Sequence, residues 1–326
     1  YTDIRFVGAP PSSIGKFGGD TDNWMWPRHT GDFSVFRVYA AADGTTPADY
    51  SPENVPYRAP VHLTVSAKGY KDGDFTMIMG FPGTTTRYMT TYEIDEMLDV
   101  ANPNRILIRG ERQKILKEDM EASDRVRIQY SDKYANSSNY WKNSIGKSKA
   151  VRKLGIRDRR QEQEAAFTAW AAKNTLPTEG YSNALNLIRE SVEETAPYFA
   201  SSQYLSEAIG RSVEILVPAR LAVSKKGGEL TEALKAFYKD YNMPTDRRVA
   251  KRMFRIVGEN CMELPSVFAE VIGKRFGGDT DAYVDYLYDN SVFATEEGTL
   301  AFVDDFSVGK RDADPAVVFV LSLIHI

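Results

Sequence analysis

The chain has 326 residues, of which 42% are hydrophobic, 12% aromatic and 26% charged, so it is long enough for one large or two ordinary domains. Its 41 basic and 45 acidic residues give a formal net charge of −4, which argues against a nucleic-acid-binding protein. No run of about 18 apolar residues occurs, so no membrane span is predicted.

The first 84 residues have the pattern of strands separated by turns. We expect strands at Asp3–Val7, Phe33–Tyr39, Val61–Val65 and Phe75–Met79, with Gly, Pro and Asp clusters between them. No helical pattern separates these strands, which favours an antiparallel sheet or barrel. Because four strands alone make a poor core, we expect partner strands elsewhere in the protein.

From Thr90 onward the apolar residues recur with helical spacing. Two one-faced stripes illustrate this: Leu230, Leu234, Phe237 and Tyr241, and Leu185, Ile188 and Val192. We expect nine to eleven helices between residues 90 and 320, with N-caps at Ser266 and Thr295. The sequence therefore predicts a β piece followed by an all-α domain.

Cysteine and histidine usage disfavours metal and disulfide chemistry. The single cysteine, Cys261, excludes an internal disulfide and a Cys-based zinc site, and we expect it to be a small buried side chain. The three histidines, His29, His62 and His325, are too scattered for a His-rich metal site. We predict neither a metal nor a cofactor.

Both ends resemble cut ends. The chain starts at Tyr1 within a strand-like alternation, and it closes in LSLIHI, residues 321–326, which matches the translated end of a common sequencing adapter. We expect these six residues to be a library artefact on a truncated reading frame, with a genuine apolar element as the alternative. His325 then supports no function, and the absence of a signal peptide indicates no compartment.

The hexapeptide FGGDTD occurs twice, at Phe17–Asp22 and Phe276–Asp281. The residues that follow the two copies differ completely, so we interpret the second copy as a turn at the start of a helix and not as a repeat. Neither copy has the spacing of a calcium-binding loop.

The segment Phe17–Tyr39 concentrates tryptophans, turn residues and titratable groups ahead of a strand, as binding loops do. One interpretation is a local triad with His29 as base, Asp32 as its orienter and Ser34 as nucleophile. Three residues on one short turn and strand rarely converge as a triad requires. We favour Asp32 alone as the catalytic group, accepting a hydrogen bond from a histidine that lies elsewhere.

The same segment offers groups for a substrate pocket. The amide of Asn23 can orient a charged amine, and the indoles of Trp24 and Trp26 supply apolar walls and a cation–π face. The alternative is structural: the tryptophans pack in a core, and Asp20, Asp22 and Asp32 are turn residues.

The stretch GDTDNWMWPRHTGDFSVFRVY, residues 19–39, resembles the signature of the bacterial dipeptidyl-peptidase 7 and 11 family of chymotrypsin-clan serine exopeptidases. Three further segments are similar to that family: VGAPPSSIGKFGGDTDNW from residue 7, MGFPGTTTRY at Met79–Tyr88, and YANSSNYWKNSIG at Tyr134–Gly146. The resemblance extends from residue 1 to about residue 320.

The resemblance implies an α+β fold, in which part of a chymotrypsin-like double β-barrel peptidase domain is followed by a large all-α capping domain. Residues 1–84 would be the C-terminal part of the first barrel half, and residues 85–320 the α-helical cap. It also implies a secreted or periplasmic protein, and it leaves a homodimer open.

The resemblance also implies site residues. Asp32 matches the triad aspartate, and Asn23 and Trp24 match residues around the free amine of the substrate. An asparagine of the helical segment contributes to that site, for which we prefer Asn139 to Asn136. The catalytic His and Ser are expected outside this chain, so the fragment itself is predicted to be inactive.

The function implied is that of a serine dipeptidyl-peptidase, an aminopeptidase-type hydrolase that releases dipeptides from peptides with a free N-terminus. An endopeptidase of the same clan is disfavoured by the amine anchor at Asn23 and Trp24. The alternative from another class is a non-catalytic helical binding or scaffold protein with a β appendage. The preference for an acidic or a hydrophobic residue at the second substrate position stays open.

Overall fold

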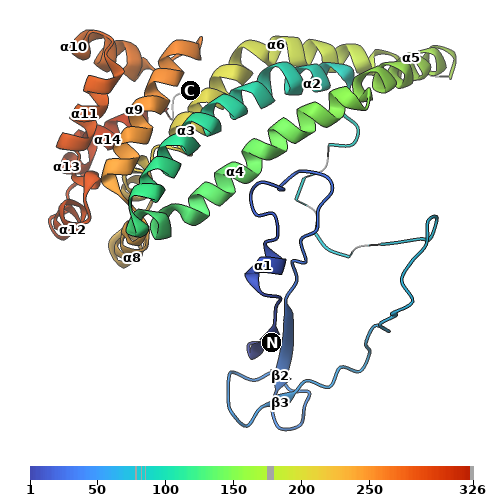
Figure 1. Cartoon of the computed structure of the whole chain (residues 1–326). Coiled ribbons are helices and arrows are strands. Elements are labelled where there is room, and N and C mark those ends of the chain that lie inside the picture. The colour runs from blue at the N-terminus through green and yellow to red at the C-terminus, as the bar shows by residue number, and fades with distance from the viewer. Residues whose placement is uncertain (78, 82, 85, 175–179, 324–326) are drawn as a thin grey trace. The chain divides into compact units, whose positions relative to one another are not determined.

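In the computed structural model, residues 1–77, 79–81, 83–84, 86–174 and 180–323 are described. The chain divides into two compact units, Tyr1–Arg87 and Tyr88–Ile326. Figure 1 shows the strands in the first unit, coloured blue, and the helices that make up the second, coloured from teal to red.

The first unit contains a small antiparallel sheet. Its strands are β1 (Ile4–Gly8), β2 (Val35–Ala40) and β3 (Val55–Pro56), in the order β1-β2-β3, with the short helix α1 (Ser12–Gly15) after β1. In the β1–β2 pair, Ile4 lies opposite Val38 and Phe6 lies opposite Phe36. The first two predicted strands are confirmed with shifts of one or two residues at their ends.

The other two predicted strands are wrong in this structure. The residues of Val61–Val65 and the described residues of Phe75–Met79 are irregular, and Val65 is 94% exposed. An alternating apolar pattern forms a strand only where a neighbouring strand accepts its backbone hydrogen bonds. The short strand β3 was missed, because its proline indicated a turn; Pro56 lies at the edge of the sheet, where proline is tolerated.

The sheet lacks a covered apolar face. Phe6, Val7, Val35 and Phe36 expose between 49% and 62% of their surfaces. One polar contact is partly buried: Arg5 donates from Nε and Nη2 to the carboxylate of the buried Asp3, at 3.0 and 2.8 Å. These hydrogen bonds from Arg5 lower the pKa of Asp3 to about 2.

The second unit is built from helices. The first group of α-helices is α2 (Thr91–Glu96), α3 (Asn102–Ala122), α4 (Asp124–Lys153), α5 (Ile156–Asn174), α6 (Ala184–Tyr204), α7 (Leu216–Ser224) and α8 (Gly227–Lys239). The second group is α9 (Met243–Asn260), α10 (Lys274–Phe276), α11 (Thr280–Asn290), α12 (Glu296–Asp304), α13 (Val308–Ala313) and α14 (Pro315–Leu323). Short π-helical segments are η1 (Met97–Ala101), η4 (Leu205–Gly210) and η5 (Phe268–Gly273), and 3₁₀ turns are η3 (Tyr181–Asn183) and η6 (Val292–Ala294).

The described part of this unit holds thirteen α-helices, α2 through α14, where nine to eleven were predicted. The excess arises because π-helical segments interrupt continuous helical rods and because several helices are only one or two turns long. No helix among the described residues has an apolar stretch long enough to cross a bilayer.

Several details of the helical prediction are confirmed. Leu230, Leu234 and Tyr241 are buried, whereas the stripe on α6 is weaker, since Ile188 is 36% exposed. Thr295 caps α12 by accepting a hydrogen bond from the Gly298 amide at 3.1 Å.

The ends of two other helices test the turn predictions. The second FGGDTD copy is a helix-start turn, because the Asp279 side chain accepts from the backbone amides of Asp281 and Ala282. The N-cap predicted at Ser266 is wrong. Ser266 is the first residue of the helix and not the residue before it. The Phe268 amide donates to the Pro265 carbonyl at 2.9 Å, so Pro265 precedes the helix.

The C-terminal segment packs on the helical core. Helix α14 continues past residue 320, and Leu321 and Leu323 lie against the buried cluster of the unit. The adapter origin of residues 321–326 stays a prediction, and His325 lies outside the described residues. Cys261 is 8% exposed, which confirms it as a buried side chain.

A buried carboxylate joins three parts of the second unit. Asp246 of α9 accepts from the backbone amides of Glu214 and Ile215, at 2.7 and 2.8 Å, just before α7. It also accepts from the hydroxyl of Tyr288 on α11, at 2.6 Å. Burial and the neighbouring Glu214 carboxylate raise the pKa of Asp246, while Lys133 lies 2.6 Å from Glu214 and balances its charge.

We predict that Asp246→Ala lowers the free energy of unfolding of the helical unit by about 3 kcal/mol, because two buried amides and a hydroxyl lose their acceptor. Urea unfolding followed by helical circular dichroism measures this. The matched control is Asp304→Ala, an exposed aspartate at the end of α12, which should change stability by less than about 0.5 kcal/mol. Equal effects of the two substitutions would contradict the role of Asp246.

Candidate functional site

The loop between α1 and β2 is closed on itself at its base. The Gly31 amide donates to the Ile14 carbonyl at 3.1 Å, and the Thr30 hydroxyl donates to the Phe17 carbonyl at 2.9 Å. Residues at the start and the end of the loop are therefore tied together immediately before β2. The loop is presented from the sheet as one ordered piece.

Two glycines of this loop leave little room for a Cβ. Gly18 has a φ of +76°, and a Cβ there would lie 1.9 Å from Oδ2 of Asp22. At Gly31 a Cβ would lie 3.0 Å from the Ile14 side chain. Part of the unusual composition of this segment is thus explained by a tight turn, with Asp22 packed over Gly18.

The side chain of Asn23 is oriented by an arginine of the same loop. Arg28 donates from Nη1 to Oδ1 of Asn23 at 3.2 Å and from Nη2 to the Thr30 hydroxyl at 3.4 Å. An amide oxygen has two lone pairs, so the bond from Arg28 is compatible with a second donor. The positive charge of Arg28 disfavours an ammonium group at the same oxygen unless an acidic group balances it.

The tryptophans of the loop are exposed. Trp24 is 50% exposed and Trp26 is 92% exposed, so neither packs in a core of the first unit as the structural alternative required. Trp24 also has a φ of +58°, a conformation that bulky residues adopt rarely and that is found at ligand sites. Exposed indoles of this kind can form the walls of a pocket.

The local triad is not assembled in this structure. His29, Asp32 and Ser34 are all exposed, and in the described part of the chain no hydrogen bond links any two of them. Asp32 lies three residues before β2, in an extended segment. This position is compatible with a carboxylate that accepts a hydrogen bond from a histidine elsewhere in the protein. The role of Asp32 in catalysis stays a prediction.

The asparagines of the helical segment lie on α4. Asn136 and Asn139 are exposed, whereas Ser137 and Ser138 between them are buried. Asn139 belongs to the second unit and Asn23 to the first, so their grouping around one substrate stays a prediction.

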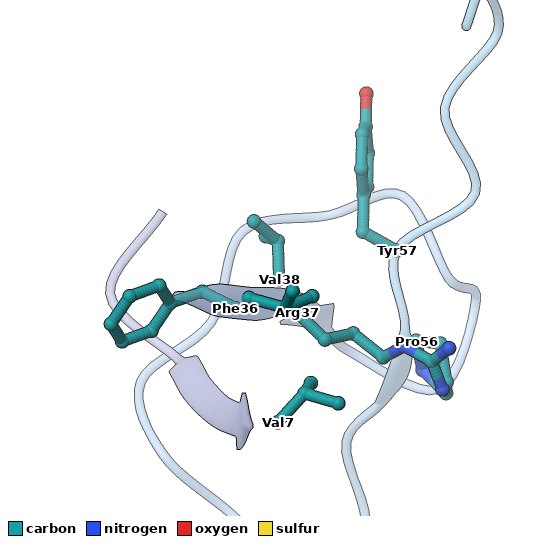
Figure 2. Close-up of a pocket in the computed structure, with 7 residues that line it drawn as sticks. Val7, Phe36, Arg37, Val38, Pro56 and Tyr57 are labelled. Atoms are coloured by element: carbon teal, nitrogen blue, oxygen red, sulfur yellow. The ribbon is translucent and has the colours of Figure 1, made fainter. Parts of the chain in front are cut away.

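The sheet carries a hollow of about 540 Å³ that sequence reasoning missed. It is lined by Val7, Val35, Phe36, Arg37, Val38, Pro56 and Tyr57. Figure 2 shows the long side chain of Arg37 extending toward Pro56, while the hydroxyl of Tyr57 points away. Its lining presents polar and apolar surface in similar amounts, since Arg37 and Tyr57 contribute beside the valines, Phe36 and Pro56.

The described residues contain no candidate metal site. Among them, no group of three or more His, Cys, Asp and Glu side chains could hold a metal ion.

Comparison with known proteins decides the family. The family model described as Peptidase S46 matches residues 1–326. The chain belongs to the peptidase S46 family.

Two relatives illustrate the match. The dipeptidyl-peptidase 7 of Phocaeicola vulgatus is 44% identical over 98% of this chain and 46% of its own length. The Asp/Glu-specific dipeptidyl-peptidase of Porphyromonas gingivalis is 39% identical over 99% of this chain and 47% of its own.

Solved structures of the family agree with the fold. The crystal structure of Porphyromonas endodontalis DPP11 in complex with the dipeptide Arg-Asp is 34% identical, with a TM-score of 0.82, over 100% of this chain and 48% of its own. The complex of the same protein with Arg-Glu is 35% identical, with a TM-score of 0.79. The S46 chain thus spans about half the length of the relatives it matches.

We predict that Gly18→Ala opens the loop of the S46 chain, because a Cβ would displace the Asp22 side chain and strain the positive φ. Amide hydrogen exchange of Asp22 and Gly31 measures the loss of protection. Gly69→Ala is the matched control, since Gly69 has a φ of +70° with nothing near its Cβ position. Unchanged protection at Gly31 in the Gly18 variant would contradict the role of this turn.

Proposed function

We propose that the chain is part of a serine dipeptidyl-peptidase that releases dipeptides from peptides with a free N-terminus. The observation that carries the proposal is the match of the whole chain to a peptidase family whose relatives are named as dipeptidyl-peptidases. Membership of that family disfavours the alternative of a non-catalytic helical scaffold with a β appendage.

Asp32 is the chain's contribution to the catalytic triad in this proposal. A serine attacks the carbonyl after the second substrate residue, and a histidine takes the serine proton and then passes it to the leaving amine. The carboxylate of Asp32 accepts the Nδ1–H of that histidine, holds its tautomer and stabilises the imidazolium. The serine and the histidine come from outside this chain, in keeping with a span of about half the relatives' length.

Asn23 and Trp24 form one side of the site for the substrate's ammonium group. The ammonium donates to Oδ1 of Asn23, and the indole of Trp24 provides an apolar wall with a cation–π face. Because Arg28 donates to the same oxygen, the site needs an acidic group to offset the guanidinium charge. Asn139 on α4 supplies a further amide. The chain matches both a dipeptidyl-peptidase 7 and an Asp/Glu-specific dipeptidyl-peptidase. We therefore propose no preference for the second substrate residue.

The first unit is proposed to be the C-terminal part of the first half of a double β-barrel, and the second unit the helical cap. The exposed sheet residues and the hollow of about 540 Å³ support this assignment, because a barrel would cover them with further strands. In such a barrel Val61–Val65 and Phe75–Met79 pair with strands from the rest of the protein. We propose that the enzyme is periplasmic or secreted.

We predict that Asp32→Asn in the protein that carries the complete peptidase lowers kcat by about 10⁴, because the amide leaves the histidine in the wrong tautomer. Release of a fluorescent group from a dipeptidyl substrate measures kcat, and circular dichroism checks that the fold is kept. Asp72→Asn, an exposed aspartate in a turn, is the control and should leave kcat unchanged. Turnover within tenfold of the parent enzyme would remove Asp32 from the triad.

We predict that Asn23→Ala lowers kcat/KM for a free-amine dipeptidyl substrate by about 10-fold to 100-fold, since a charge-assisted hydrogen bond contributes about 1.5–3 kcal/mol. The slow turnover of the N-acetylated substrate should not change. Parallel assays of Asn139→Ala and Asn136→Ala separate the two asparagines of α4, with an effect expected for Asn139 alone. An equal loss with free and blocked substrates would contradict the amine-anchor role of Asn23.

A further inference from the structure

The helical unit contains a cavity of about 650 Å³ lined mainly by α6 and η4, with Arg220 of α7, Glu263 and Leu323 completing it. Its lining includes the serines Ser202 and Ser206, the side chain of Leu205, and two charged residues, Arg220 and Glu263. The volume lies in the range of small-molecule sites, about 300–1,000 Å³. None of these residues belongs to the site predicted from the sequence.

Arg220 has an unusual set of partners. It is half-buried, and it donates from Nε to the Leu216 carbonyl at 3.1 Å and from Nη2 to the Gly210 carbonyl at 2.9 Å. In the described part of the chain no carboxylate lies within ion-pair distance of it. By contrast, the buried guanidinium of Arg109 on α3 lies 2.7 Å from the carboxylate of Glu207.

A half-buried guanidinium without a carboxylate partner favours the binding of an anion. Burial lowers the pKa of Arg220, because the charged form loses water and gains no opposite charge. A guanidinium has five N–H donors, of which Arg220 uses two on backbone carbonyls. The remaining donors include hydrogens on both terminal nitrogens, the pair that binds a carboxylate through two parallel hydrogen bonds.

A carboxylate stands elsewhere in the same lining. Glu263 is exposed, and its backbone amide donates to the hydroxyl of Ser201 on α6 at 3.2 Å, which ties it to the cavity. Among the described residues Glu263 forms no ion pair, so it and Arg220 do not neutralise each other. The cavity therefore presents one cation, one anion and serine hydroxyls, the complement of a small zwitterion.

We propose that this cavity binds a short peptide as a zwitterion, with the peptide carboxylate on Arg220 and its ammonium on Glu263. The choice of a dipeptide rests on the proposed function, because a dipeptide is the product of that reaction. The π-helical segment η4 supports a ligand role for this place, since such segments occur often at functional sites.

Isothermal titration calorimetry of the 326-residue chain with Ala-Ala tests the proposal. We expect saturable binding that weakens about tenfold or more when the peptide carboxylate is replaced by an amide, and equally when Arg220 is changed to Met. Arg159→Met is the matched control, because Arg159 also donates to a backbone carbonyl, that of Leu154, but lies outside the cavity. It should leave the affinity unchanged.

A second variant guards against misfolding of the Arg220→Met chain. Glu263→Gln changes an exposed side chain and should weaken binding of Ala-Ala about tenfold while leaving binding of N-acetyl-Ala-Ala unchanged. Arg220 and Glu263 are not among the residues proposed to bind or cleave the peptide substrate. Failure of Arg220-dependent peptide binding would therefore leave the proposed dipeptidyl-peptidase activity untouched, and failure of that activity would leave the binding proposal untouched.

Three results would overturn the proposal. The first is the absence of saturable Ala-Ala binding to the parent chain, and the second is equal affinity for Ala-Ala and its amide. The third is inorganic phosphate binding at least as tightly as Ala-Ala and displacing it, which would mark a simple anion site.

Discussion

The backbone of a β-strand satisfies its hydrogen bonds only through a neighbouring strand, whereas a helix satisfies them within itself. This difference governs the two units of the chain. The helices of the second unit bury a continuous apolar cluster, and the three strands of the first leave residues such as Phe6 and Phe36 more than half exposed. We therefore propose that the β unit is the part that needs further strands from a larger peptidase.

Buried polar groups link neighbouring helices of the helical unit. Asp246 provides an acceptor for two backbone amides and for Tyr288, so one side chain links α9 with the start of α7 and with α11. Arg220 performs a similar task at the end of η4 but keeps donors for a ligand. Removing the acceptor Asp246 would leave buried donors without a partner, which destabilises a fold, whereas the unused donors of Arg220 are the basis of the peptide-binding proposal.

The sequence predicted the change from strand to helix, the strands at β1 and β2, and the burial of Leu230, Leu234 and Cys261, because these depend on local periodicity. It failed at Val61–Val65, where the alternating pattern is present but no strand forms in this structure. The Arg28–Asn23 bond and the clash that reserves position 18 for glycine were also missed. Both depend on how a loop folds back, which residue spacing does not determine.

We propose that this chain forms one wall of an N-terminal dipeptide-releasing site. Mass spectrometry of the products formed from one decapeptide, free or acetylated at its N-terminus, by the complete enzyme tests it most directly. The account predicts successive dipeptides from the free peptide and essentially none from the acetylated one. Internal cleavage of both peptides at similar rates would contradict it.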